Sequence, residues 1–185
     1  MKFKVTDKQW ALAQKVGMAR FNSKNHYSST RNLSKINTHV CGATAEVVFG
    51  EWQGFDLDTS IHETEGDKFD FVSRCKETTD VKHSTFGGAD IELKEKVENV
   101  EAGKLKDIYV LCRAIVRHER VVEVWVIGWI SRVEFLREEN KREPYVPNNP
   151  KYPVNYVVGL DKLEPFDGKK YGIEVKKDLL AGIGV

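Results

Sequence analysis

Two aspartates and a lysine stand at a spacing that could place them around a divalent cation. Asp70 and Asp80 flank a polar segment centred on Cys75, and Lys82 follows two residues after the second aspartate. In a β-hairpin about Cys75, residues whose numbers sum to 150 face each other, so Asp70 would lie opposite Asp80. Directly opposed side chains are about 4.5–5.5 Å apart at Cβ. Lys82 shares the Asp80 face, because side chains alternate along a strand.

Two opposed carboxylates repel each other, and a divalent cation removes the conflict. Mg²⁺ or Mn²⁺ takes carboxylate, water and phosphate oxygens and lowers the pKa of a bound water. A lysine beside the cation can orient that water or stabilise developing negative charge. This register therefore predicts a hydrolytic centre, and a slip of one residue would put the two aspartates on opposite faces. The residues of the other parity, expected in the core, are Phe69, Phe71 and Val81.

A third acid lies earlier in the chain, among small and apolar residues. Glu46 follows Gly42-Ala43-Thr44-Ala45 and precedes Val47, in a stretch expected to be helical. Burying an unpaired carboxylate is costly. We therefore expect Glu46 to meet a cation or a metal ion.

An acid on an early helix, followed by two acids and a lysine on a hairpin, resembles the PD-(D/E)xK nuclease superfamily. The residues that carry the resemblance are Glu46, Asp70, Asp80 and Lys82, within the segment 42–84. Phe69 stands where the proline of the name-giving motif would be. The later segments 106–111 and 126–130 are similar to small nuclease-like proteins of phages and mobile elements.

The resemblance implies a restriction-endonuclease-like fold and Mg²⁺- or Mn²⁺-dependent hydrolysis of DNA. It implies that Asp70, Asp80 and Glu46 bind the metal and that Lys82 assists the attacking water. Many such enzymes pair up to cut both strands, so a homodimer is possible. The rival interpretation is a catalytically dormant DNA-binding or accessory protein with the same fold.

Two alternative centres use other Glu-x-Lys triplets, which arise by chance roughly once or twice in a chain of this size. One combines Asp80 with Glu92 and Lys94, although Gly87-Gly88 interrupts the path and the polar alternation is typical of a solvated edge strand. The other combines Asp167 with Glu174-Val175-Lys176, in a Gly- and Lys-rich tail. Strand context and the helix acid favour the Asp70 arrangement.

Several further side chains are candidates for supporting roles. His83 has core parity, and His39 lies two helical turns before Glu46 on the same face. Trp125 and Trp129 are four residues apart in an apolar strand and are expected to share a core face. The candidates for contacting DNA are Lys24, Arg31 and Lys35, in a polar segment after the first helix, and Ser84.

The elements expected to position these residues run from helices to strands. Apolar periodicity predicts helices at 7–22, capped by Thr6 or Asp7, and at 38–50, capped by Thr38 and ended by Gly50 and Gly54. Nearly continuous apolar runs at 108–116 and 121–130, joined by a turn at 118–120, predict central strands covered on both faces. The remaining expectations are a short helix within 132–139, a loop at 140–153 and a strand within 154–163. Together they predict one α+β domain over 1–185, with helices packed on a mixed sheet.

Composition bounds these hypotheses. Hydrophobic residues make up 41% of the chain and charged residues 31%, which is typical of a folded, soluble domain. The net charge of +1 means that any basic surface must be local. Three scattered cysteines argue against a disulfide framework and a zinc site. We expect a cytoplasmic protein (in the host cell, if phage-encoded) with no membrane segment, and no nucleotide-binding motif is present.

Overall fold

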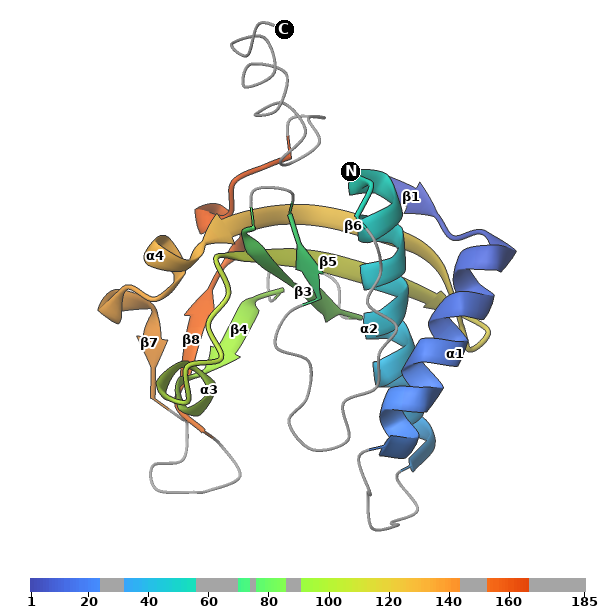
Figure 1. The fold of residues 1–185 in the computed structure, drawn as a ribbon, viewed down its shortest axis with the longest axis horizontal. Coiled ribbons are helices and arrows are strands. Elements are labelled where there is room, and N and C mark those ends of the chain that lie inside the picture. The colour runs from blue at the N-terminus through green and yellow to red at the C-terminus, as the bar shows by residue number, and fades with distance from the viewer. Residues whose placement is uncertain (24–31, 56–69, 74–75, 86–90, 144–152, 167–185) are drawn as a thin grey trace, which may run out of the picture.

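The computed structural model describes residues 1–23, 32–55, 70–73, 76–85, 91–143 and 153–166. Within them the chain has the expected α+β composition: two long helices, two short helices, a mixed five-stranded sheet and a smaller sheet (Figure 1). The strands are β1 (Lys2–Lys4), β2 (Phe71–Val72), β3 (Thr78–Ser84), β4 (Leu93–Lys96), β5 (Ile108–Arg117), β6 (Arg120–Ser131), β7 (Lys141–Arg142) and β8 (Asn155–Val158). The helices are α1 (Asp7–Ser23), α2 (Asn32–Gln53), α3 (Val97–Glu101) and α4 (Arg132–Phe135), with 3₁₀ turns η1 (Glu138–Asn140) and η2 (Leu160–Lys162).

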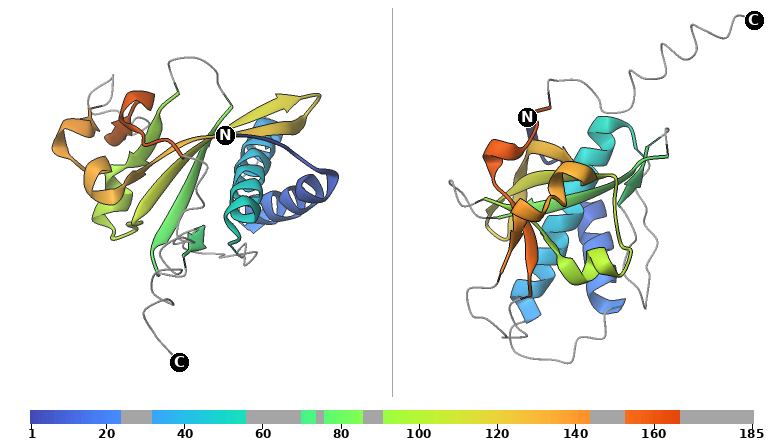
Figure 2. Two further views of the ribbon diagram at one scale, coloured as in Figure 1. Left: turned by 90° about the horizontal axis from the view of Figure 1, so that it is seen from above. Right: turned by 90° about the vertical axis from the view of Figure 1, so that its left-hand side faces the viewer.

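The large sheet has the order β1-β6-β5-β3-β2, with β3 and β5 parallel and the other pairs antiparallel. Helices α1 and α2 pack together along one face, and the smaller sheet β4-β8-β7 lies on the opposite side (Figure 2). One core forms under α2 around Phe49, Phe71 and Val81. A second core forms between the sheets around Tyr109 and Leu111. None of the helices in the described part of the chain has the length and hydrophobicity to cross a bilayer.

Helix α1 confirms the first predicted helix and its Thr6 cap. The backbone N–H of Gln9 donates to Thr6 Oγ1 at 3.2 Å, and the Thr6 N–H donates to Gln9 Oε1 at 2.8 Å. This reciprocal pair satisfies two backbone donors at the start of the helix. Gly17 then lets α1 approach α2 closely, because a Cβ there would lie 2.7 Å from Val40 Cα.

Helix α2 is longer than predicted, and two of its predicted limits are wrong. It begins at Asn32, so Thr38 lies inside the helix and does not cap it. Gly50 does not end it either. That glycine lies against the Phe71 ring, where a Cβ would be 2.8 Å from Cε1. The helix ends at Gln53, followed by Gly54 with φ +74°, a conformation that glycine adopts without strain.

The β2–β3 hairpin has the predicted register. Phe71 pairs with Thr79 and Val72 with Thr78, so the paired numbers sum to 150. Phe71 and Val81 are buried in the first core, as their parity predicted. Phe69 lies outside the described residues.

The β5–β6 hairpin is also confirmed, with His118 and Glu119 at positive φ in its two-residue turn. Both faces are covered only along the first half of β5, because full burial ends at Cys112 and burial alternates along β6. The expectation that Trp125 and Trp129 share a face is wrong. The pairing changes from Leu111–Gly128 to Cys112–Val126, which leaves an extra residue in β6. Such a bulge reverses side-chain parity beyond it.

Candidate active site

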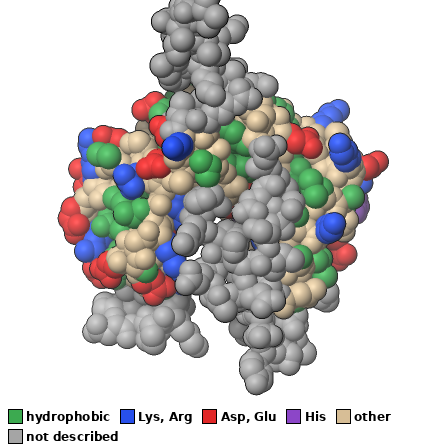
Figure 3. Space-filling view, viewed as in Figure 1, with side chains coloured by type: hydrophobic (Ala, Val, Ile, Leu, Met, Phe, Trp, Pro, Cys, Tyr) green, Lys and Arg blue, Asp and Glu red, His purple; other side chains and the backbone are tan. Residues whose placement is uncertain are grey.

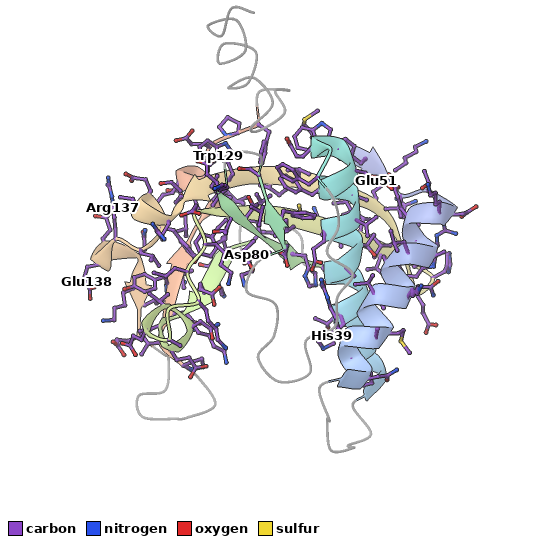
Figure 4. The ribbon with its side chains drawn as sticks, in the orientation of Figure 1. His39, Glu51, Asp80, Trp129, Arg137 and Glu138 are labelled. Carbon is purple, nitrogen blue, oxygen red and sulfur yellow. The ribbon has the colours of Figure 1, made fainter. Side chains whose placement is uncertain are left out.

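Strand β3 carries the candidate site on one face and core side chains on the other. Asp80 pairs in register with Tyr109 of β5, and Lys82 pairs with Leu111. These residues face the second core, whereas Val81 packs into the first core under α2. Asp80 lies at the centre of the molecule, between α2 and the smaller sheet (Figure 4). The hairpin thus brings Asp80 and Lys82 to the same face, as predicted.

The Lys82 ammonium is held between two carboxylates. Its Nζ lies 2.8 Å from Asp80 Oδ2 and 3.0 Å from Glu95 Oε2. Burial works to lower the pKa of Lys82, but the two carboxylates outweigh it and raise that pKa above its usual range. Lys82 is therefore a cation in this site, fixed in position by residues from two different sheets.

Glu95 was not among the residues predicted from the sequence. It is 4% exposed on β4, and it accepts hydrogen bonds from Asn99 Nδ2 at 2.7 Å and from the Lys96 N–H at 3.0 Å. Burial raises the pKa of its carboxyl, but Lys82 and these donors lower it below its ordinary value. The available signal was alternation, because Leu93 and Glu95 have the same parity and both point inward.

The alternative centre built on Glu92 and Lys94 lies on the other side of this segment. Lys94 Nζ contacts Glu92 at 2.9 Å, Arg142 contacts Glu92 at 2.7 Å, and the Lys94 side chain is 56% exposed. This is the solvated edge that the sequence indicated. The structure brings Glu95, and not Glu92, to Lys82.

Asp70 lies just before β2, where the hairpin pairing ends. Its N–H donates to Thr79 O at 3.0 Å, and its Oδ2 accepts the Val81 N–H at 2.6 Å. Its carboxylate thus occupies the sheet edge next to β3. Burial, followed by the charges of Glu46 and Asp80, raises the pKa of Asp70 well above its usual range; the Val81 N–H and Arg20 oppose this. The pKa of Asp70 therefore depends on the charges of both other candidate ligands, Glu46 and Asp80.

Glu46 meets a cation, as its burial predicted. It is 6% exposed on α2, and Arg20 of α1 donates to both of its oxygens, at 2.8 and 2.6 Å. The close crossing of α1 and α2 at Gly17, one helical turn before Arg20, brings the two side chains together. A single guanidinium nitrogen, Nη1, thus bridges both carboxylate oxygens, and these charge-assisted hydrogen bonds hold the carboxylate against α1.

The charges at the site fit an additional divalent cation. Four carboxylates, those of Glu46, Asp70, Asp80 and Glu95, gather with two cations, Arg20 and Lys82. Two negative charges therefore remain when all six groups are ionised. As arranged here, however, the described residues contain no set of three His, Cys, Asp or Glu with ligand geometry. Asp70 and Asp80 would hold the ion directly, and Glu46 would join them only by moving from Arg20.

His83 lies on the opposite face of β3, within electrostatic range of His39. His83 is half-buried against Gly42 of α2, where a Cβ would lie 3.2 Å from its Nδ1. Burial, with the nearby His39 and Lys82, lowers the pKa of His83 to about 4. The inward parity of His83 is thus confirmed, and its imidazole is neutral at physiological pH.

The remaining candidates divide into those placed and those outside the described residues. Ser84 is the last residue of β3 and pairs in register with Arg113 of β5. The candidates that lie outside the described residues are Lys24, Arg31, the side chain of Lys35, and the alternative centre of Asp167, Glu174 and Lys176.

A polar pocket also lies at α4 and η1, where the labelled Arg137 and Glu138 stand well away from Asp80 (Figure 4). Its charges pair among themselves, with Arg137 2.6 Å from Glu134 and Lys162 3.3 Å from Glu139. Comparison of the chain with protein-family models, with curated proteins and with solved structures finds no match.

Proposed function

We propose that this chain is a Mg²⁺- or Mn²⁺-dependent DNA nuclease of the PD-(D/E)xK type, with a restriction-endonuclease-like fold. The observation that carries the proposal is the hairpin register. It places Asp70 beside β3 at the edge of the sheet, where its charge acts on that of Asp80, and it keeps Lys82 on the same face as Asp80. An acidic surface with no catalytic role would require neither this hairpin register nor a lysine beside Asp80.

The excess negative charge supports a cation as part of the working site. Asp70 is buried close to Glu46 and Asp80, and this crowding disfavours its ionised form. A divalent cation bound to Asp70 and Asp80 would remove that repulsion, neutralise charge on a phosphate and make a water a stronger nucleophile. Glu46 would complete the set of ligands once it is released by Arg20.

Lys82 is suited to act on the phosphate or on the water. Its ammonium contacts the carboxylates of Asp80 and Glu95, and an ammonium carries three N–H donors with which it can also reach a phosphate or a water. Hydrolysis joins the water oxygen to phosphorus and breaks the bond to the leaving sugar oxygen, which takes up a proton. Negative charge grows on the phosphate oxygens in that step, and a fixed ammonium stabilises it.

The direct test is cleavage of plasmid and linear duplex DNA by the full chain in Mg²⁺, in Mn²⁺ and in EDTA. We expect cleavage in either metal and none in EDTA. Asp80→Asn should abolish it, while Glu92→Gln, on the exposed side of the β4 segment, should leave it unchanged.

A wild-type protein that cuts neither DNA nor RNA in either metal would refute the nuclease. If that protein still bound DNA, the rival function, a dormant DNA-binding protein, would take its place. Cleavage that survives Asp80→Asn would instead refute the assignment of the site.

A further inference from the structure

A row of four side chains crosses the large sheet beside the candidate site. Ser84 of β3 pairs with Arg113 of β5, Arg113 pairs with Trp125 of β6, and Trp125 pairs with Lys2 of β1. Residues paired across neighbouring strands project from the same face. Ser84 also shares the face of Lys82, because it lies two residues further along the same strand. The row therefore starts next to the candidate site and runs away from it.

The middle of this row is held together by the indole ring. Lys2 Nζ lies 4.1 Å from the centre of the Trp125 ring, and Arg113 Cζ lies 5.0 Å from it. The indole N–H donates to Glu123 at 2.9 Å, which fixes the orientation of the ring. Trp125 thus gathers two cations at one point of the sheet.

These two cations lack the partners that most other basic residues have. Among the described residues, neither Lys2 nor Arg113 forms an ion pair, and Arg113 Nε is buried without a hydrogen-bond partner. Elsewhere acidic and basic side chains are interspersed over β4, α3 and α4 (Figure 3). The basic residues that pair with carboxylates are Arg20, Lys82, Lys94, Lys96, Arg120, Arg132, Arg137, Lys141, Arg142 and Lys162.

We propose that the row Lys2–Trp125–Arg113–Ser84 binds the phosphate backbone of substrate DNA and leads it to Lys82. The proposal rests on the nuclease function, and it supplies the local basic surface that a net charge of +1 requires. Three strand spacings of about 4.8 Å make the row about 14 Å long. That length corresponds to about four base-pair steps of 3.4 Å.

The chemistry of the row favours the backbone over the bases. Two unpaired cations and a hydroxyl are donors that suit phosphate oxygens. Both cations already lie over the indole ring, so its role is to position them and not to stack a base. A phenylalanine ring in place of Trp125 would still attract the cations, although less strongly than the indole does. The pattern predicts binding that depends steeply on salt and little on base sequence.

The test is the affinity of a fluorescently labelled DNA duplex for the full chain in EDTA, measured by anisotropy across a salt series. Without metal the DNA stays intact. We expect Lys2→Ala and Arg113→Gln each to weaken binding roughly three- to tenfold. Each should also lower the magnitude of the salt slope by about 0.9. Trp125→Ala should weaken binding as much as Lys2→Ala and Arg113→Gln do together. Trp125→Phe should keep most of the wild-type affinity.

Lys96→Ala is the matched control, because this exposed lysine of β4 pairs with Glu98. It should bind within twofold of the wild type. Lys2 is exposed on β1, so its replacement tests the row even if Arg113→Gln unfolds. Circular dichroism verifies the fold of each variant.

Three outcomes separate this proposal from the nuclease function. If the wild type binds DNA without cutting it and the row variants bind more weakly, the row is supported and the nuclease function is refuted. DNA cleavage by a wild type whose row variants keep its affinity and salt slope would refute the row alone. A wild type with no measurable affinity for DNA at low salt would refute the row.

Discussion

At Lys82, one ammonium links two strands that belong to different sheets. Asp80 reaches it from β3 and Glu95 from β4, so its position depends on both cores. Charged groups this buried are stable only when their partners are in place. The same arrangement that stabilises the fold holds a fixed positive charge next to Asp80.

Replacement of Lys82 by alanine should therefore separate chemistry from binding. The variant loses the donor that stabilises charge on the phosphate, so its single-turnover cleavage rate should fall roughly 10²- to 10³-fold. Its affinity for DNA in EDTA should change less than threefold, because the row from Lys2 to Ser84 is untouched. An equal loss of affinity and rate would mean that Lys82 only binds the substrate.

Glu95 is expected to act through Lys82 as a positioning residue. Glu95→Ala should lower the cleavage rate roughly tenfold or more with little change in KM, because the ammonium is held by one carboxylate less. Glu95→Gln, which keeps an oxygen to accept the Lys82 N–H, should recover part of the rate.

The decisive comparison is a double-mutant cycle with Lys82→Ala. If Glu95 works through Lys82, its replacement should cost little further activity once the lysine is absent. If the double variant loses activity by the product of the two single-variant factors, Glu95 has a separate, structural role. Glu98→Gln, on the neighbouring exposed pair with Lys96, is the matched control.

His83 should make stability sensitive to mild acid. Its folded pKa is about 4, below the ordinary value of 6.5, and the charged or titratable groups facing it are His39 from α2 and Lys82 along β3. Between these values the unfolded chain binds a proton that the folded chain does not. The free energy of unfolding should therefore fall as pH drops from 6.5 to 4, by up to about 3 kcal/mol.

Urea unfolding at pH 7.5 and pH 5 measures this contribution. His83→Gln should lose less stability than the wild type over that interval, since it has no imidazole to protonate. His118→Gln, in the exposed β5–β6 turn, should behave as the wild type does. An identical pH dependence in all three proteins would contradict the assignment to His83.

At the scale of elements, local patterns predicted most of what positions the site. The hairpin register followed from a short turn placed about Cys75, and the core parity of Phe71 and Val81 agreed with it. The start of α2 was missed because polar residues interrupt the apolar spacing of Leu33, Ile36 and Val40. The prediction that Trp125 and Trp129 share a face was wrong because nothing in the sequence marks the β6 bulge, which depends on how two strands pair.

The crossing of α1 and α2 is the element contact on which Arg20 and Glu46 depend. Gly17→Ala would place a Cβ 2.7 Å from the Val40 backbone, which cannot move aside as a flexible side chain could. We expect a loss of about 1–3 kcal/mol in the free energy of unfolding, measured with urea. Lys15→Ala, at an exposed position of the same helix, should change it by less than about 0.5 kcal/mol. A stabilised Gly17→Ala variant would contradict the close crossing.

At the scale of the whole molecule, charge is arranged around the large sheet in two opposite ways. Acids exceed cations at the site, whereas Lys2 and Arg113 remain unpaired on the neighbouring strands. Neither feature is visible in a net charge of +1. The contact of Glu95 with Lys82 and the alignment of Lys2 with Arg113 escaped sequence reasoning for the same reason, since each depends on strands that are distant in the chain.

The central claim is that Asp70 and Asp80 together hold a divalent cation, and Mn²⁺ binding tests it most directly. Calorimetric titration of the wild type should show one Mn²⁺ bound per chain. Asp70→Asn and Asp80→Asn should each weaken binding by at least about tenfold, and Glu92→Gln should not. If both asparagine variants bind Mn²⁺ as tightly as the wild type, the two aspartates do not form a metal site.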